Sequence, residues 1–466
     1  NSIVRNGLTD VSLGAGVLPP APGGNPLDGY VADTGRYLVP YTAPPDFIGA
    51  DSADPKVAMR IGTRRLEVNL DTGSRGLYFD ALQLDPDIVL DGPRGYVYLN
   101  SSNRLYFGTW STQEVEFVDA TFTPPGTETP VARPAVAIVP VLVVSAIGAS
   151  TVPPPGSVAA STTFGTTVAT GSVWITDGTR RSSAPIIPVP APRPGGPLGT
   201  VTIPGGWWAS YADNRRDGAS ILSSVSNFGV GFDRSGLGTF PTTAALNQSY
   251  NAFLNVAEMR AGTMRAGYVI SPEGVTLGLD AAQSGFAYTR LAPTGLAAGA
   301  ASPPDWQPAM GALTFDGTPA ATGPIVIDMG IPFSILTLPG RSQGQTFKGR
   351  LGVQFLNSGG AVAYVVNTLP GTTTLDPANL LNPSSVESFS SLPGAYSQNA
   401  PPASGQFFNT GRALFAAFAY LYDATGGTLG LKAVDQSVLD SASGAFTAEF
   451  FVNPTLPTGV TNVTIR

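Results

Sequence analysis

Two aspartates in matching surroundings are the residues of this chain that could do acid–base chemistry together. The apolar stretch Leu66–Leu70 leads directly to Asp71, the stretch Pro324–Ile327 leads to Asp328, and each Asp begins an Asp-x-Gly sequence. The 466 residues include neither His nor Cys. This excludes imidazole catalysis, thiol nucleophiles, disulfides and zinc sites built from His or Cys. Any hydrolysis would therefore depend on carboxyl groups.

A pair of carboxyl groups can activate water if the fold holds the two side by side. Two carboxylates at short range cannot both ionise cheaply, so they share one proton over a wide acidic range. One then takes a proton from a water molecule while the other polarises a peptide carbonyl, and no covalent acyl-enzyme forms. A glycine close behind each Asp lets loop amides approach the carboxyl groups. A single Asp-x-Gly is usually only a turn, so it is the repetition that indicates chemistry.

The elements that must position these aspartates are predicted to be strands. The chain has 56 Gly, 43 Pro, 42% hydrophobic residues and 12% charged residues, which is typical of folded β-structure with many turns. Val57–Ile61 and Leu66–Leu70 are expected to pair through a turn at Gly62. Ala135–Ala149 is predicted to be a buried strand, because it is too short to span a bilayer. The fold class is therefore all-β.

The first Asp loop reads Asp71-Thr-Gly-Ser74. It resembles the N-lobe active-site loop of the pepsin-like aspartic peptidases. Other landmarks follow in the order of that family and cover most of the chain. A segment downstream is similar to the flap hairpin, and two glycines resemble those of the strands that thread beside each Asp loop. These landmarks are Tyr106, Phe107 and Gly108 for the flap and Gly229 and Gly411 for the strand glycines.

The resemblance implies a bilobal pepsin-like (acid protease) β-barrel fold with a central cleft. We expect an N-terminal extended arm at 1–45 and an N-terminal lobe at 46–255 that carries the first Asp loop. A Pro/Gly-rich insertion is expected at about 121–206 within that lobe, and a C-terminal lobe at 256–466 carries the second Asp loop. The resemblance assigns the catalytic pair and the two loops to Asp71, Thr72, Gly73, Ser74, Asp328, Met329, Gly330 and Ile331.

The second loop departs from the family pattern at two positions. Family loops carry a Thr whose hydroxyl bonds the backbone of the opposite loop, and Met329 has no such group. The family also carries Ser or Thr where this chain has Ile331, which cannot donate to the outer oxygen of Asp328. We therefore expect the charged form of Asp328 to be less stabilised than in the family. Activity would be weaker or shifted.

Structural roles are expected for several other residues that stand out. Arg75, directly after the first loop, is interpreted as a solvated surface charge. Trp207, Trp208 and Trp306 are expected to pack in the core or in loops rather than to form subsite walls. The segment most similar to an apolar helix runs from about Gly411 to Tyr422.

The leading functional hypothesis is an aspartic endopeptidase that hydrolyses peptide bonds with the Asp71 and Asp328 pair and favours acidic pH. It would need no cofactor and no metal, and a peptide or protein substrate would lie in the cleft. The alternative is a catalytically inactive secreted or surface protein of the same fold that binds a protein or glycan, which Met329, Ile331 and the insertion favour. A surface-layer or coat component would explain the low charge but not the paired loops.

Charge and hydropathy limit the partners. The chain has 25 basic and 32 acidic residues, a net charge of −7, and no basic cluster, so we expect no nucleic acid partner. No apolar stretch is long enough to span a membrane. The first residue is Asn, so we expect the mature form of a secreted or extracellular protein, acting as a monomer. Glycosylation sequons stand at Asn100, Asn247 and Asn462.

Overall fold

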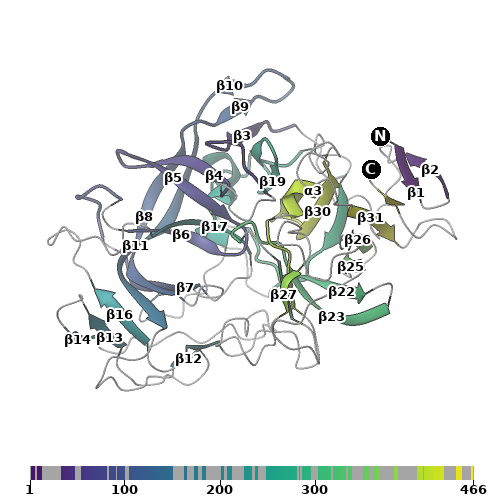
Figure 1. Ribbon diagram of the computed structural model, residues 1–466. Coiled ribbons are helices and arrows are strands. Elements are labelled where there is room, and N and C mark those ends of the chain that lie inside the picture. The colour runs from purple at the N-terminus through teal and green to yellow at the C-terminus, as the bar shows by residue number, and fades with distance from the viewer. Residues whose placement is uncertain are drawn as a thin grey trace.

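In the computed structural model, the regular secondary structure of the described residues is almost entirely β-strand, with a few helical turns (Figure 1). The residues it describes are 2–5, 8–12, 33–47, 54–80, 83–90, 92–99, 104–150, 162–164, 173–176, 181–184, 201–203, 207–211, 225–232, 237–239, 248–280, 283, 286–294, 303–315, 318–331, 334–337, 350–355, 361–367, 383–386, 407–412, 414–434, 448–453 and 463–464. The all-β prediction is confirmed. No helix in these ranges is long and apolar enough to cross a membrane.

Six strands of the N-terminal half close into a barrel. In ring order they are β4 (Lys56–Ile61), β5 (Arg64–Asp71), β17 (Ser226–Val230), β6 (Arg75–Asp80), β11 (Ala135–Ser150) and β8 (Arg104–Phe117), and β8 pairs again with β4. The predicted hairpin of β4 and β5 is confirmed, with Gly62 at the positive φ of 59° that its turn requires. Apolar side chains alternate into the barrel, including Met59, Val68, Leu70 and Leu77.

Additional strands extend the barrel sheet. They are β7 (Arg94–Leu99), β18 (Leu237–Thr239), β16 (Trp207–Tyr211), β13 (Val173–Thr176) and β14 (Arg181–Ala184), while β12 (Thr162–Phe164) and β15 (Val201–Ile203) pair separately. Two 3₁₀ turns and one helical turn follow: η1 (Gln248–Tyr250), η2 (Ala252–Leu254) and α2 (Ala257–Arg260). The structure describes only the backbone of Trp207 and Trp208 on β16.

Residues 121–150, which the sequence analysis assigned to the start of the insertion, belong to the body of the protein. They form β9 (Thr121–Thr123), β10 (Val131–Ala132) and β11. β11 pairs with β8 along its length and with β6 in parallel. Its described side chains include the fully buried Val139, Val141 and Leu142, which confirms the predicted buried strand. Most of 151–206 lies outside the described residues.

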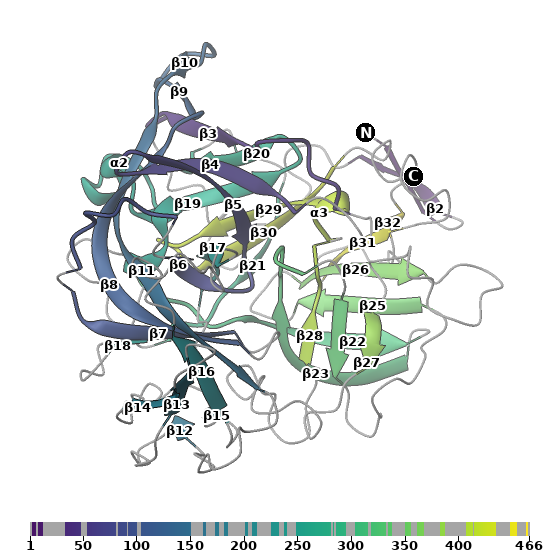
Figure 2. The same cartoon turned by 60° about the vertical axis from the view of Figure 1, so that its left-hand side comes forward.

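A second sheet joins the beginning, middle and end of the chain. Its order is β10, β9, β3 (Arg36–Pro40), β20 (Gly274–Leu277), β19 (Gly267–Ser271), β29 (Phe418–Asp423), β30 (Thr428–Ala433) and β21 (Ala287–Arg290). The expected N-terminal arm thus contributes β3 to this sheet, where it pairs with β20 and β9. In Figure 2, β3, β20, β19 and β29 follow one another as neighbouring strands of this sheet.

The third sheet carries the second candidate aspartate. Its order is β2 (Leu8–Ser12), β1 (Ser2–Arg5), β32 (Val463–Thr464), β31 (Ala448–Asn453), β26 (Ala361–Asn367), β25 (Arg350–Phe355), β22 (Ala309–Phe315), β23 (Thr318–Val326), β28 (Phe407–Asn409), β24 (Ser334–Thr337) and β27 (Pro383–Val386). Its strands lie opposite the barrel in Figure 2.

The helix suggested for 411–422 is only one turn long. α3 (Leu414–Ala417) ends where β29 begins, and β29 pairs with β19 on one side and β30 on the other. All six side chains of β29 are buried. Two flanking strands supply the backbone of 418–423 with ladder hydrogen bonds, and this pairing outweighs the local helical spacing.

Aromatic rings form one continuous core between the barrel and the second sheet. Phe117 of β8 packs against Phe253 at 5.1 Å between centroids, and Phe253 packs against Tyr268 of β19 at 5.7 Å. Phe232, two residues beyond β17, stacks on Tyr422 of β29 at 4.4 Å. The two parts are therefore joined by apolar burial as well as by backbone pairing.

A buried ion pair crosses the same junction. Nη2 of Arg75 lies 3.1 Å from Oδ2 of Asp305, and the two side chains are only 2% and 0% exposed. The interpretation of Arg75 as a solvated surface charge is therefore wrong. Its charge is compensated by a residue 230 positions away, and nothing in the local sequence identifies that partner.

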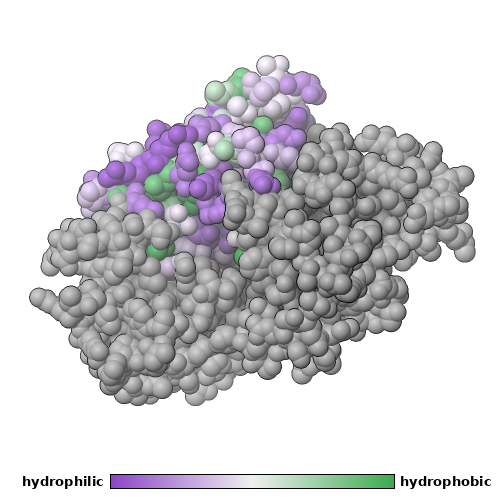
Figure 3. Space-filling model, in the orientation of Figure 1, coloured by the Kyte–Doolittle hydropathy of each residue, from purple (hydrophilic) through white to green (hydrophobic). Residues whose placement is uncertain are grey.

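Hydrophilic residues predominate in Figure 3 on the part of the surface that lies over β4 and β5. Ion pairs link neighbouring strands there. Arg65 contacts Asp119 at 2.7 Å and Arg60 contacts Glu116, with both arginines about half exposed. Exposed pairs of this kind contribute roughly 0–1 kcal/mol.

Removing the buried arginine tests how strongly the junction depends on its ion pair. We expect Arg75→Met to lower the free energy of unfolding by about 3–5 kcal/mol, because Asp305 would remain buried without its cation. Urea unfolding followed by tryptophan fluorescence measures the change. Arg65→Met is the matched exposed control and should cost at most about 1 kcal/mol. Equal effects of the two variants would contradict the prediction, whereas Arg75→Met/Asp305→Leu should recover most of the loss.

Candidate active site

The two candidate aspartates occupy equivalent places in two copies of one three-strand arrangement. Asp71 ends β5, residues 72–74 lead into β6, and β17 lies between these strands, parallel to β5 and antiparallel to β6. Asp328 follows β23, its loop leads toward β24, and β28 lies between them, parallel to β23 and antiparallel to β24. The local topology around the two aspartates is therefore repeated.

The strand glycines lie level with the aspartates. Gly229 of β17 is in register with Asp71. In the other copy Asn409 is in register with Val326, so Gly411, two residues on, is level with Asp328. A side chain at Gly229 would lie 2.4 Å from the backbone of Arg75, which explains why only glycine fits this threading strand.

Each carboxyl group packs against the glycine of the opposite loop. A methyl group at Gly73 would lie 2.2 Å from Cγ of Asp328, and one at Gly330 would lie 2.4 Å from Cγ of Asp71. Contacts this short mean that a side chain at either glycine would displace the opposite carboxyl group. The structure thus brings Asp71 and Asp328, 257 positions apart in sequence, against each other's loops.

Backbone amides of each loop hold its own carboxyl group. Oδ1 of Asp71 accepts hydrogen bonds from the amides of Gly73 and Ser74 at 2.7 and 3.1 Å. Oδ1 of Asp328 accepts one from the amide of Gly330 at 2.8 Å. Each such bond fixes the orientation of a carboxyl group.

Thr72 braces the two loops from one side. Its Oγ1 donates to the carbonyl of Ile327 and accepts from the amide of Met329, both at 2.8 Å. Met329 is completely buried within the apolar core, and its side chain makes no equivalent bond because it has no suitable group. The brace is therefore one-sided, as the sequence of the second loop predicts.

Asn409 corrects the expectation about Asp328. Its Nδ2 donates to Oδ2 of Asp328 at 2.6 Å, and its Oδ1 accepts from the amide of Gly411 at 2.9 Å. The expectation that the charged form of Asp328 is less stabilised because Ile331 lacks a hydroxyl is therefore wrong: another strand supplies the donor. The sequence reasoning missed Asn409, although the repeated Asn-x-Gly spacing at Asn227 and Asn409 was a usable signal.

Tyr78 is a second neighbour of the site that sequence reasoning missed. It is buried on β6, and burial, helped by the nearby Asp71 carboxylate, raises the pKa of Tyr78 well above its usual range, while Ser74 and Asn227 partly oppose the shift. Its ring lies 5.5 Å from that of Tyr106. The phenol therefore stays neutral across the acidic and neutral range.

The residues predicted to form the flap lie on β8, opposite β7. Tyr106 pairs with Val97 and is buried beside Tyr78, while Gly108 lies against the carbonyl of Val143 in β11. Of Phe107 the structure describes only the backbone, and residues 100–103 lie outside the described part of the chain. The predicted flap segment thus forms the base of this hairpin.

The two carboxyl groups differ in exposure. Asp328 is 6% exposed and Asp71 is partly exposed, whereas Gly330 is exposed. Within the described ranges no group of three or more carboxylates is arranged to hold a metal ion. The arrangement can bind water between two carboxyl groups and move protons between them.

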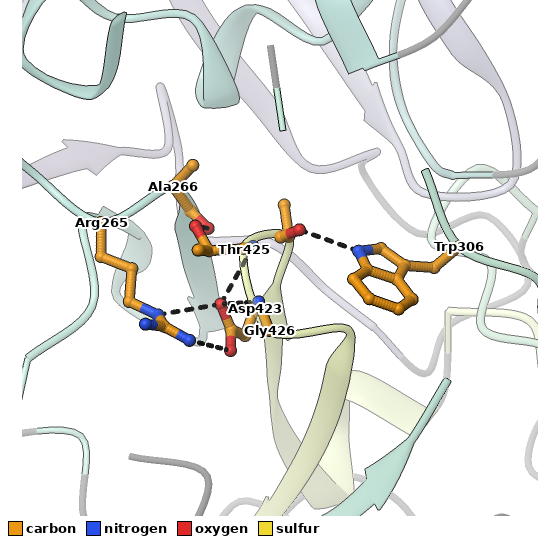
Figure 4. Close-up of polar contacts among 7 residues, drawn as sticks. Arg265, Ala266, Trp306, Asp423, Thr425 and Gly426 are labelled. Atoms are coloured by element: carbon orange, nitrogen blue, oxygen red, sulfur yellow. Dashed lines mark hydrogen bonds and ion pairs between the residues drawn. The ribbon is translucent and has the colours of Figure 1, made fainter. Parts of the chain in front are cut away.

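The buried carboxylate of Asp423 shows a contrasting, structural arrangement. Asp423, at the end of β29, receives Nε and Nη2 of Arg265 at 3.1 and 2.9 Å and the amides of Thr425 and Gly426 at 3.1 and 3.0 Å (Figure 4). Trp306 closes the turn by donating to the carbonyl of Ala424, which confirms its packing role. Because Asp423 is fully compensated, we assign it to the β29–β30 turn.

Replacing Thr72 tests the one-sided brace. We expect Thr72→Val to lower the free energy of unfolding by about 2–5 kcal/mol, because two buried backbone groups lose their partner at about 1–3 kcal/mol each. Chemical unfolding measures the loss. Thr72→Ser keeps the hydroxyl and should cost much less, so similar losses in both variants would contradict this role.

A double-mutant cycle tests the packing of Gly330 against Asp71. We expect Gly330→Ala to destabilise the protein by about 1–3 kcal/mol through overpacking. The cost should fall by at least about 1 kcal/mol in an Asp71→Ala background, because the clashing carboxyl group is gone. Asp328→Ala, which removes the carboxyl group of the same loop, is the control background. Relief there but not with Asp71→Ala would rule out the contact.

Neither the models of known protein families nor the curated proteins give a match to this chain.

Proposed function

We propose that this protein is an aspartic endopeptidase that hydrolyses peptide bonds with a water molecule held between Asp71 and Asp328. The observation that carries the proposal is the reciprocal packing of each carboxyl group against the glycine of the opposite loop. A structural carboxylate such as Asp423 is satisfied by a cation. The described contacts of Asp71 are instead with loop amides, which leaves the pair able to exchange protons.

The reaction needs only the groups that the two loops present. One carboxylate removes a proton from the water molecule while the water oxygen attacks the carbon of the peptide carbonyl. The other carboxyl group gives its proton to the carbonyl oxygen. The resulting diol collapses when the peptide nitrogen is protonated and the C–N bond breaks. No nucleophilic side chain is consumed, which suits a chain without His or Cys.

The finer features of the hypothesis belong to the same proposal. They are a bilobal pepsin-like fold with a central cleft, an extended peptide or protein as substrate, an acidic optimum, a monomeric state and a secreted or extracellular location. The repeated three-strand arrangement supports the bilobal fold, because an internal repeat supplies one aspartate from each half.

A second candidate function is a catalytically silent protein of this fold that binds a protein or glycan. The specific observation in its favour is Met329, whose buried side chain takes the place of one half of the brace between the loops. A looser second loop would weaken catalysis without destroying the fold.

Cleavage of an unstructured protein substrate tests the proposal. We expect hydrolysis between about pH 2.5 and about pH 7 with an acidic optimum, because the pair must hold one proton. Asp71→Asn and Asp328→Asn should each lower kcat by about 10²–10⁴-fold. A statine-type transition-state mimic should inhibit the unmodified protein. Fragments identified by mass spectrometry measure the reaction.

Two controls make the result decisive. Asp423→Asn alters a buried carboxylate outside the site. If this variant still cleaves the substrate, the loss of cleavage in the other variants is specific to Asp71 and Asp328. Circular dichroism confirms that each variant is folded. A folded, unmodified protein that cleaves nothing at any pH would overturn the proposal and favour the binding protein.

A further inference from the structure

We propose that Asn409 is a positioning residue that replaces the missing loop hydroxyl and makes Asp328 the member of the pair that carries the negative charge. Asp328 would then accept the proton of the attacking water, and Asp71 would donate to the carbonyl oxygen of the substrate. This assignment of roles rests on the proposed function, whereas the charge on Asp328 does not.

The orientation of the Asn409 amide is determined by its two hydrogen bonds. Its Oδ1 accepts from the amide of Gly411, so its Nδ2 must face Asp328, where it donates to Oδ2 at 2.6 Å. Asn409 is 3% exposed and ends β28, which is held between β23 and β24. A buried, fixed N–H donor stabilises an ionised carboxylate more than a protonated one.

The equivalent asparagine of the other copy does not reach its aspartate. Asn227 and Asn409 both lie two residues before the strand glycine that is level with an Asp. Nδ2 of Asn227 donates to Oγ of Ser74 at 2.7 Å. The corresponding position of the other loop is Ile331, which has no polar side-chain atom to accept from Asn409, and Asn409 bonds Asp328 directly.

The donors are consequently distributed unequally over the four carboxyl oxygens. Both oxygens of Asp328 receive an N–H, one from Gly330 and one from Asn409. Asp71 receives two, and both are on Oδ1. In the described part of the chain no N–H is directed at Oδ2 of Asp71, which leaves that oxygen able to hold the shared proton.

The neighbouring charged groups do not reverse this order. Asp71 and Asp328 face each other, so each disfavours the charge of the other equally. Tyr78 faces Asp71 from β6 and is neutral. Arg412 follows β28, holds the carbonyl of Ile331 through its amide at 2.9 Å and pairs with Asp54 at 2.6 Å. The guanidinium is compensated by Asp54, which also accepts a hydrogen bond from Asn69 of β5.

Alkylation by a small epoxide shows which of the two aspartates is ionised, and it does not require peptidase activity. A carboxylate oxygen attacks the epoxide carbon, the ring C–O bond breaks, and the alkoxide takes a proton from water, whereas a protonated carboxyl group does not react. At about pH 4, near the usual range of carboxyl groups, we expect the ester mainly on Asp328. Peptide mapping by mass spectrometry distinguishes it from an ester on Asp71.

The variants test whether Asn409 is responsible. Asn409→Leu keeps a side chain of similar size but removes the N–H donor. We expect the ratio of labelling on Asp328 to labelling on Asp71 to fall about tenfold, which corresponds to a change of about one unit in the difference between the two pKa values. Asn227→Leu is the matched control and should leave the ratio within about twofold. Adding Ile331→Ser to Asn409→Leu restores a hydroxyl and should recover most of the preference.

A pH profile then tests the assigned roles. In Asn409→Leu the acidic limb of kcat/KM should move to higher pH by about one unit, and Ile331→Ser should move it back. Unmodified protein labelled equally on both aspartates, or mainly on Asp71, would overturn the proposal, even if Asn409→Leu failed to fold. Selective labelling of Asp328 that depends on Asn409, in a protein that cleaves nothing, would retain the charge assignment and reject the peptidase.

Discussion

The contact on which the rest of the structure depends is the reciprocal one between each carboxyl group and the glycine of the opposite loop. Neither loop can form it alone, because the partners come from segments 257 positions apart. Backbone amides orient each carboxyl group, and Thr72 joins the two loops. The surrounding strands hold these loops in place, since β17 and β28 each thread between the strands on either side of an Asp. The site is thus a product of the tertiary fold rather than of either half.

Several parts of the molecule hold the two halves in this relation. The second sheet combines β3 from near the start of the chain with β29 and β30 from near its end. Stacked aromatic rings fill the space between that sheet and the barrel. The Arg75–Asp305 pair connects the strand after the first Asp loop to the segment before the second one. Buried pairs add little net stability, but losing one partner is costly, so this pair favours a single arrangement of the halves.

The two copies of the site arrangement are similar but not equivalent. The first has Thr72 and Ser74, whereas the second has Met329 and Ile331. The structure compensates for one of these differences and not for the other. Asn409 provides the donor that Ile331 lacks, while Met329 packs in the core and leaves the brace one-sided. A hydroxyl can be replaced by any donor that reaches the same oxygen, but a bond between two loops must come from a residue in one of them.

The sequence by itself determined the all-β class, the hairpin that leads to Asp71, the buried strand that begins at Ala135 and the presence of two strand-Asp-x-Gly sequences, because these depend on local spacing and turn chemistry. It also indicated correctly that Met329 leaves one side of the brace open. Only the tertiary structure decided that Arg75 is buried against Asp305, that 418–423 forms a strand rather than a helix, and that Asn409 donates to Asp328. Each of these depends on a partner far away in the chain, and the local sequence contains no information about which partner the fold brings near.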